Sequence, residues 1–252
     1  MVLEIRNLSK SFGGLRVIDE LSFGVERGER LALIGPNGAG KTTVFNLISG
    51  VYPPDSGQIV LEGDDISALA SRYRIRRGLA RTFQNIRLMP HLSVIENVMI
   101  TQYVRSPGLR AMLQPVGFRR ANRWRDEARA ALAEAGLEAY AGEPAGALPY
   151  GIQKRVELVR ALLAAPRVLL LDEPAAGLNP VESEALHRAL AAIAARGITL
   201  VVVEHDMQFV GRLCQRVVAL NFGVKIADCA VAEIHADHRV REAYLGTEEH
   251  AA

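Results

Sequence analysis

A glycine-rich segment between a predicted strand and a predicted helix carries the most specific chemical signal in the sequence. Gly35, Gly40, Lys41 and Thr42 match the spacing G-x-x-x-x-G-K-[ST] of a phosphate-binding P-loop. Glycines let the backbone turn tightly there, so that its N–H groups can approach phosphate oxygens. The helix that begins near Gly40 adds unsatisfied donors and the positive end of its dipole. The segment predicts binding of a nucleoside triphosphate.

Two side chains of this segment are expected to bind different parts of a triphosphate and its metal ion. Lys41 supplies a compact positive charge for the β- and γ-phosphates, and the hydroxyl of Thr42 is placed to bind Mg²⁺. The lysine is informative because the basic residues of this chain are mostly arginines. A chance match in a surface turn is disfavoured, because the apolar runs Leu31–Ile34 and Val44–Ile48 flank the segment. The residues expected around the phosphates are Gly35, Pro36, Asn37, Gly38, Ala39, Gly40, Lys41, Thr42 and Thr43.

A second group of polar residues follows two apolar runs that have the character of buried strands. Asp172 and Glu173 follow Val168–Leu171, and His205 closely follows Ile198–Val203. Asp172 is placed to hold Mg²⁺, and Glu173 to orient or deprotonate the attacking water. The position of His205 at the same expected sheet edge favours a contact with the γ-phosphate over the ordinary role of a satisfied histidine.

The strands and helices that must position these residues alternate along the chain. Leu3–Leu8 and Leu21–Val25 alternate apolar and polar residues as half-buried strands do, whereas the region from Pro90 to Pro149 lacks β-rich runs. Continuous apolar strands separated by helices indicate a parallel sheet. The predicted fold is α/β, a P-loop NTPase core with a mostly parallel, doubly wound sheet, a small antiparallel β lobe and an inserted helical lobe.

Local signals place the remaining elements. Asn179 is expected to cap a helix that has Pro180 at its first position and Glu182 at its third. The other predicted helices are Ser67 to about Leu79, Asp126–Leu137 and Ile152–Ala165, with breaks at Ser106–Gly108 and Gln114–Gly117, and the other predicted strands are Gln58–Gly63 and Ala80–Phe83.

Charge and hydropathy exclude several classes of function. The 30 basic and 28 acidic residues nearly balance, so the overall charge does not indicate a nucleic-acid-binding protein. Two arginine clusters, 72–81 and 119–125, are interpreted as solvated helix faces or as a surface for anionic lipid or a partner's acidic loops. Neither a membrane span nor a signal peptide is expected, so any membrane role would come through a partner. Cys214 and Cys229 have no metal or disulfide spacing, which suits a reducing cytosol.

The motifs of this sequence, in their order, resemble those of the ATP-binding subunits of ABC transporters. The resemblance covers essentially the whole chain and rests on the P-loop, Gln84, Leu148–Gln153, Leu171–Pro174, Ala176–Asn179 and His205. It implies one ABC-type domain over residues 1–252. Within it, 1–88 and 160–230 would form the nucleotide-binding core with the β lobe, 89–159 the helical lobe with the signature loop, and 231–252 a C-terminal tail.

The resemblance implies a head-to-tail dimer that holds ATP between the P-loop of one subunit and the signature loop of the other. Tyr150 and Gly151 belong to this signature loop and would face the partner's ATP. Gln84 would contribute to catalysis by sensing Mg²⁺ and the nucleotide, and would signal to a membrane partner through the helical lobe. Phe12 would stack on adenine, although its position alone is equally consistent with a plain hairpin residue.

Two positions depart from the family pattern. The signature is usually Leu-Ser-Gly-Gly-Gln, whereas this chain has Pro149, Tyr150 and Ile152. Pro149 lacks the hydroxyl that would bond the γ-phosphate, and it has no N–H to offer instead. Asn179 stands where an aspartate is usual, and its capping role explains that choice.

A finer resemblance points to bacterial high-affinity importers of branched-chain amino acids. It rests on Arg81–Arg87, the insert Tyr103–Trp124, Asp172–Pro180, Val203–Met207 and the tail Val240–Gly246. Such importers pair two different ATP-binding subunits with two integral-membrane permeases and a periplasmic binding protein. This implies a peripheral place for the chain on the cytoplasmic face of the inner membrane. The transported substrate never touches this subunit, so its identity rests on the resemblance alone.

Three other interpretations compete with this one. The same kind of ATPase could serve urea, amide or other amino acid uptake or lipopolysaccharide export, although the insert before Trp124 argues against the exporter. A non-transport ABC protein of translation or DNA repair usually carries two cassettes or a large coiled-coil insertion, for which 252 residues leave no room. An unrelated P-loop kinase or GTPase would leave the Gly151 loop and His205 without a task.

Overall fold

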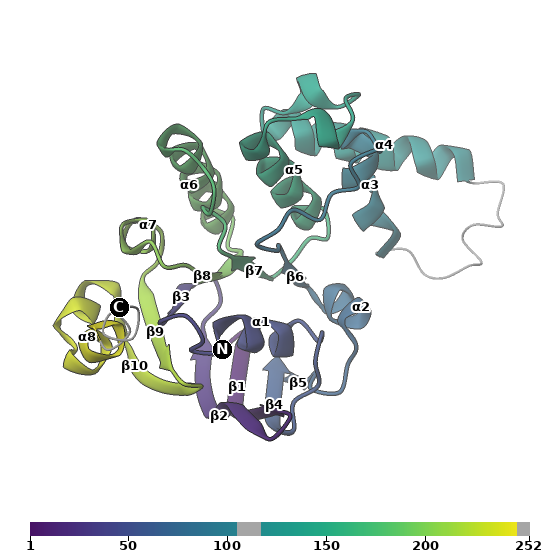
Figure 1. Ribbon diagram of the computed structural model, residues 1–252. Helices are drawn as coiled ribbons and strands as arrows, with labels where there is room; N and C mark the ends of the chain where they lie inside the picture. The colour runs from purple at the N-terminus through teal and green to yellow at the C-terminus, as the bar shows by residue number, and fades with distance from the viewer. Residues whose placement is uncertain (105–116, 246–252) are drawn as a thin grey trace.

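A six-stranded sheet forms the centre of the molecule (Figure 1). The structure, a computed structural model, describes residues 1–104 and 117–245. The strand order is β10-β9-β3-β8-β7-β6, and all neighbours from β9 to β6 are parallel, whereas β10 is antiparallel to β9. The strands are β3 (Arg30–Ile34), β6 (Leu79–Arg81), β7 (Val168–Asp172), β8 (Thr199–Val203), β9 (Arg216–Asn221) and β10 (Val224–Ala230). The predicted α/β core with a mostly parallel sheet is confirmed.

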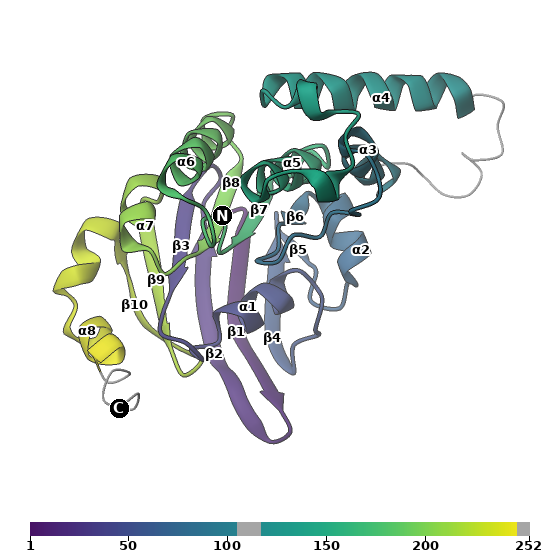
Figure 2. The ribbon, with the colours of Figure 1, turned by 45° about the horizontal axis from the view of Figure 1, so that its top comes forward.

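A second, antiparallel sheet forms the β lobe, which also agrees with the prediction (Figure 2). Its order is β2-β1-β4-β5, with β1 (Leu3–Phe12), β2 (Leu15–Val25), β4 (Ser56–Leu61) and β5 (Asp64–Asp65). Helix α1 (Lys41–Ile48) buries its apolar side chains in one cluster together with this lobe and one face of the six-stranded sheet. The helix that follows the P-loop is therefore held between the two sheets.

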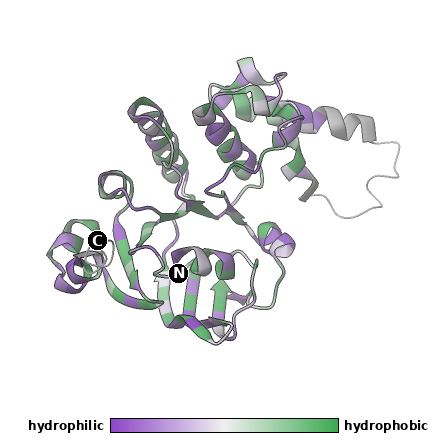
Figure 3. Cartoon of the chain, viewed as in Figure 1, coloured by the Kyte–Doolittle hydropathy of each residue, from purple (hydrophilic) through white to green (hydrophobic). Residues whose placement is uncertain are grey.

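Side chains of the six-stranded sheet alternate between two apolar layers. From β3, Leu31 and Leu33 join the cluster with α1, whereas Ala32 and Ile34 join a cluster on the other face. The helices that pack on that other face include α6 (Pro180–Ala195), α7 (Met207–Leu213), the 3-10 helix η5 (Val231–Ala236) and α8 (His238–Leu245), together with part of α5 (Tyr150–Leu162). Burial on both faces explains the continuous apolar runs of these strands, and Figure 3 shows apolar residues along both sheets.

The helical lobe, which we define as α3, α4 and α5, projects from the sheet and has its own apolar core (Figures 1 and 2). Its helices are α3 (Val94–Val104), α4 (Gly117–Glu134) and α5 (Tyr150–Leu162), with 3-10 helices η3 (Glu138–Tyr140) and η4 (Ala145–Ala147) between α4 and α5. Among the described residues no helix has the length and apolar character needed to cross a membrane. The breaks expected at 106–108 and 114–117 lie outside the described residues, apart from Gly117, and so does most of the 103–124 insert.

The stretch expected as one helix from Ser67 to about Leu79 is mostly not α-helical. The structure has only the short helix α2 (Ser71–Arg74) and the 3-10 helix η1 (Ile75–Arg77), and Leu79 already begins β6. Gly78 has a φ of 86°, a left-handed conformation that ends a helix and that glycine adopts without steric cost. The prediction was wrong because it carried the helix through this glycine into the strand.

The predicted cap of α6 is confirmed. Asn179 Oδ1 accepts hydrogen bonds from the N–H groups of Val181 and Glu182, both at 3.0 Å. The carboxylate of Glu182 in turn accepts from the Asn179 N–H at 3.0 Å, and Pro180 is the first residue of the helix. These reciprocal bonds form a capping box, so the asparagine has a local structural task.

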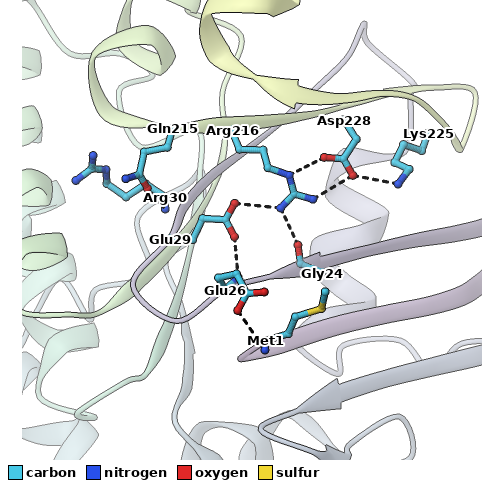
Figure 4. Close-up of polar contacts among 9 residues, drawn as sticks. All are labelled: Met1, Gly24, Glu26, Glu29, Arg30, Gln215, Arg216, Lys225 and Asp228. Atoms are coloured by element: carbon cyan, nitrogen blue, oxygen red, sulfur yellow. Dashed lines mark hydrogen bonds and ion pairs between the residues drawn. The ribbon is translucent and has the colours of Figure 1, made fainter.

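A polar network ties the β lobe to the six-stranded sheet at the strand ends opposite the P-loop (Figure 4). Arg216, the first residue of β9, donates to both carboxylate oxygens of Asp228 on β10, at 2.6 and 3.0 Å. It also donates to Glu29 and to the carbonyl of Gly24 on β2, each at 3.0 Å. These hydrogen bonds hold the β lobe to one end of the strands, and the candidate functional residues lie at the opposite strand ends.

Candidate active site

Three neighbouring parallel strands end where the sequence predicts the chemistry. β3 leads into the P-loop, β7 ends with Asp172 and is followed by Glu173, and β8 is followed by Glu204 and His205. β8 lies between β3 and β7 and pairs with each of them in parallel. Parallel neighbours present their carboxyl ends at one edge, so the fold brings these three sets of residues to the same place.

The conformation of the P-loop depends on two glycines. Gly35 and Gly40 have φ values of 152° and 99°. A Cβ atom on Gly35 would clash with the carbonyl oxygen of Leu220, and one on Gly40 would lie 2.7 Å from Cδ1 of Ile18. Gly40 also offers no side-chain cap to α1, which leaves the first N–H groups of this helix for a bound anion.

Lys41 is folded back onto the loop and lies near the acidic pair. Its ammonium group donates to the carbonyl oxygens of Gly35 at 2.6 Å and Pro36 at 2.9 Å. Burial lowers the pKa of Lys41, and the negative charges of Glu173 and Asp172 partly oppose that shift. A phosphate can replace the two carbonyls as the acceptor of this charged group.

Asp172 is paired with an arginine that the sequence did not assign to the site. Arg81 Nη2 donates to Asp172 Oδ2 at 2.7 Å, and Arg81 Nη1 donates to Asn46 Oδ1 at 2.8 Å and Ser49 Oγ at 2.9 Å. The Arg81 and Asp172 side chains are only 6% and 7% exposed. The expectation that the 72–81 cluster is a solvated face is wrong for Arg81, and also for Arg74, which is 1% exposed.

Gln84 lies against Glu173, so two residues expected to act in catalysis are in contact. Gln84 Nε2 donates to Glu173 Oε2 at 2.6 Å. Glu173 has a φ of 45°, a left-handed conformation that is uncommon for a side chain of this size. The ammonium group of Lys154, on α5, donates to the Gln84 carbonyl at 2.8 Å, and burial lowers the pKa of Lys154.

Two more charged side chains of α5 hold the segment after Gln84. Glu157 accepts a hydrogen bond from the Arg87 N–H at 3.0 Å, and Arg160 donates to the Arg87 carbonyl at 2.6 Å. Burial raises the pKa of Glu157. Since α5 begins with Tyr150 and Gly151, which are expected in the signature loop, we call α5 the signature helix. These bonds connect it directly to the segment that carries Gln84.

His205 and Glu204 follow β8 but differ in exposure. The His205 side chain is 65% exposed, whereas that of Glu204 is 1% exposed. The Glu204 carboxylate accepts from the N–H groups of Ala175 at 2.9 Å and His205 at 3.2 Å, and burial raises its pKa. The exposed imidazole is accessible to a ligand at this edge, and its contact with a γ-phosphate stays a prediction.

Phe12 is the last residue of β1 and is 40% exposed. Its ring packs edge-to-face on Tyr52, with the ring centroids 5.3 Å apart, and the Lys10 ammonium lies 5.4 Å from its centroid. These contacts orient the ring while part of it stays in solvent, and stacking on adenine stays a prediction.

Tyr150 and Gly151 begin α5 in the helical lobe. Gly151 lies against the first turn of α6, because a Cβ on Gly151 would clash with Glu182. Tyr150 lies against the loop between β7 and α6, where a Cβ on Gly177 would lie 3.2 Å from the Tyr150 ring. Pro149 precedes the helix in an extended conformation and makes no side-chain cap bond. The structure therefore places the signature residues on a different element from the P-loop.

Comparison with known proteins gives consistent matches. The sequence matches a family model described as ABC transporter over residues 18–176. It is 39% identical over 249 residues to the high-affinity branched-chain amino acid transport ATP-binding protein BraF of Pseudomonas aeruginosa, covering 97% of this chain and 98% of that protein. It is 34% identical over 244 residues to the lipopolysaccharide export system ATP-binding protein LptB of Escherichia coli, covering 97% of each.

Solved structures agree with the fold. A nucleotide-free ATP-binding cassette from an ABC transporter superposes with a TM-score of 0.84 at 28% identity, covering 96% of this chain and 98% of that one. A dimeric post-hydrolysis state of an ATP-binding cassette bound to ADP and Pi superposes with a TM-score of 0.77 at 25% identity, covering 91% and 98%. With these matches and the arrangement of its P-loop, the chain belongs to the ABC transporter family, as an ATP-hydrolysing subunit.

Proposed function

We propose that this chain hydrolyses ATP to power an importer of branched-chain amino acids. The observation that carries the proposal is the convergence of Lys41, Asp172 and Glu173 at one sheet edge. A lysine and an acidic pair beside a P-loop suit phosphoryl transfer. The likeness to BraF over nearly the whole chain supports the substrate class.

Three side chains divide the chemistry in this proposal. Lys41 exchanges the carbonyls that it now binds for oxygens of the β- and γ-phosphates, which are stronger, charged acceptors. Glu173 orients and deprotonates the attacking water once the Gln84 amide releases its carboxylate. His205 contacts the γ-phosphate from the end of the neighbouring strand.

Oxygen donors at this edge fit Mg²⁺. The Thr42 hydroxyl at the start of α1 and the Asp172 carboxylate would hold the ion, with the side-chain oxygen of Gln84 as a further ligand. Within residues 1–104 and 117–245 there is no group of three or more His, Cys, Asp or Glu side chains that could hold a metal alone. This suits an ion bound largely by phosphate and water. When bound, Mg²⁺ would neutralise charge that develops on the phosphates.

The proposed assembly is a dimer of ATP-binding subunits on membrane partners. Tyr150 and Gly151 lie on a different element from the P-loop, so they suit contact with the ATP of a second subunit arranged head to tail. The dimeric cassette among the similar structures supports this arrangement. The other partners are two integral-membrane permeases and, indirectly, a periplasmic substrate-binding protein, with this chain peripheral on the cytoplasmic face of the inner membrane. Nucleic acid has no part in it.

Uptake by cells tests the substrate class. A strain that lacks this chain is complemented with the wild type or with Glu173→Gln, and uptake of labelled leucine, isoleucine and valine is compared with uptake of urea. We expect the wild type alone to restore uptake of the three amino acids. Restored urea uptake without amino acid uptake would contradict the proposal and favour a related transporter.

Replacing Gln84 by alanine should reduce substrate-stimulated ATP turnover more than ATP binding. The Gln84 amide contacts Glu173 and its carbonyl is held by Lys154 of the signature helix, so it lies between the base and the helical lobe. The measurement is the ATPase rate of the reconstituted transporter with and without loaded binding protein. Loss of ATP affinity in the isolated subunit would show that Gln84 has a structural role instead.

Pro149 should make the two ATP sites of a mixed dimer unequal. It would complete the partner's site with one charge-assisted hydrogen bond fewer, at a cost of about 1.5–3 kcal/mol. The Gly151 N–H and the dipole of α5 recover part of that. The site built on Lys41 and Glu173 is then the faster one, provided that the partner keeps a serine.

Two variants measure this asymmetry in the assembled complex. Glu173→Gln should lower ATP turnover more than the equivalent change in the partner subunit, and Pro149→Ser should speed the partner's site. Equal losses from the two base variants, or a larger loss from the partner's, would show that Pro149 creates no functional difference.

A further inference from the structure

The last residue of β6 and a residue just after it each bind one of the two carboxylates at the end of β7. Arg81, the last residue of β6, binds Asp172, and Gln84, three residues later, binds Glu173. β6 runs parallel to β7 in a register that sets Arg81 opposite Leu170. The contact between Gln84 and Glu173 already has a role in the proposed mechanism, whereas the contact between Arg81 and Asp172 has none.

Two polar side chains of α1 and two aromatic rings hold the Arg81 guanidinium in place. Its Nη1 donates to Asn46 and Ser49 of α1, at 2.8 and 2.9 Å. The guanidinium carbon lies 4.8 Å from the centroid of Phe83 and 5.6 Å from that of Phe45. With several contacts around it and only 6% of its side chain exposed, the guanidinium has little freedom to turn. The guanidinium therefore has a fixed position beside the proposed ATP site.

The bond from Arg81 distinguishes the two oxygens of Asp172. Oδ2 accepts from Arg81 at 2.7 Å, whereas Oδ1 accepts no hydrogen bond from any residue that the structure describes. We propose that Arg81 is a positioning residue for the metal of the ATP site: it anchors Asp172 through Oδ2 and so keeps Oδ1 available to Mg²⁺ or its water. This rests on the ATPase activity and not on which substrate is transported.

Removal of Arg81 would have two effects of opposite sign, which makes the role testable. Loss of its positive charge alone would make the site more negative and would favour Mg²⁺. Loss of its anchoring bond would free the Asp172 carboxylate to rotate and would reduce the gain in ATP affinity that Mg²⁺ brings. Arg81→Lys separates the two effects, because it keeps the charge and loses the planar fork that reaches Asp172 and α1 together.

The test measures the ATP affinity of the full-length chain with Mg²⁺ and with EDTA. All variants carry Glu173→Gln, which stops hydrolysis during the titration. We define the coupling ratio as the dissociation constant of ATP with EDTA divided by that with Mg²⁺. This ratio measures the thermodynamic coupling between metal and nucleotide. We expect both Arg81→Met and Arg81→Lys to lower this ratio at least threefold relative to the Glu173→Gln parent. If thermal unfolding shows that Arg81→Met is not folded, Arg81→Lys decides alone.

Arg74→Met is the matched control. Arg74 is also buried and donates to the carbonyls of Leu47 and Ile48 at the end of α1, and its guanidinium donates to backbone carbonyls and not to Asp172. We expect this variant to unfold at a lower temperature and to keep the coupling ratio within threefold of the parent.

The outcomes separate positioning from other roles of Arg81. Three results for the coupling ratio would overturn the proposal. A fall of less than threefold in the Arg81 variants would show that Arg81 has no such role, and a rise in Arg81→Met would show a purely electrostatic role. An equal fall in Arg74→Met would show a general structural role. A parent with no measurable ATP affinity would count against the ATP-binding function itself, which distinguishes that failure from a failure of the Arg81 proposal.

Discussion

The Glu173→Gln variant should bind ATP with wild-type affinity and hydrolyse it about 10²–10⁴-fold more slowly, the usual contribution of a general base. Glutamine keeps the size of the side chain and an oxygen that can still accept from Gln84, so the site should keep its shape. Only the ability to take a proton from water is lost. The measurements are phosphate release and a direct ATP-binding titration.

The same variant should accumulate as an ATP-bound dimer with its partner subunit, because the step that would separate the subunits is blocked. Size-exclusion chromatography with ATP detects this complex. Glu184→Gln is the control, since Glu184 is an exposed carboxylate on α6 that pairs with Arg212. Wild-type turnover by Glu173→Gln would show that Glu173 is not the base.

Lys41→Ala should weaken ATP binding itself by about tenfold to a hundredfold, the equivalent of about 1.5–3 kcal/mol for a hydrogen bond to a charged group. The ammonium donates to the P-loop carbonyls and lies near the acidic pair, and no other lysine of the chain is in the loop. The measurement is an equilibrium titration with ATP. Lys225→Ala is the control, because Lys225 lies on β10 and pairs with Asp228. Unchanged affinity in Lys41→Ala would refute the P-loop assignment.

The sequence was sufficient to predict the sheet edge and the groups that meet there. The P-loop spacing around Lys41 and the apolar strands before Asp172 and His205 are local patterns with a direct structural meaning. Parallel strands then present their carboxyl ends together, which brings distant segments to one edge without knowledge of any side-chain contact. The fold class followed from the same pattern.

Contacts made across the sheet could not be predicted in this way. Arg81 stands in a run of arginines that has the composition of a solvated face, and its burial results from the pairing of β6 with β7 beside α1. Lys154 reaches Gln84 only because α5 packs on the segment that follows β6. Both depend on which elements are neighbours in space. The one available signal was that Arg81 ends a short apolar strand two residues before Phe83.

Leucine transport by the reconstituted complex tests the account most directly. The chain, its partner subunit, the permeases and the binding protein are assembled in proteoliposomes with ATP on the side of this chain. We predict that leucine crosses the membrane only with ATP and the binding protein, and that Lys41→Ala in this chain reduces the rate at least tenfold. Leucine transport that is unaffected by Lys41→Ala, or a complex that hydrolyses ATP without moving leucine, would contradict the account.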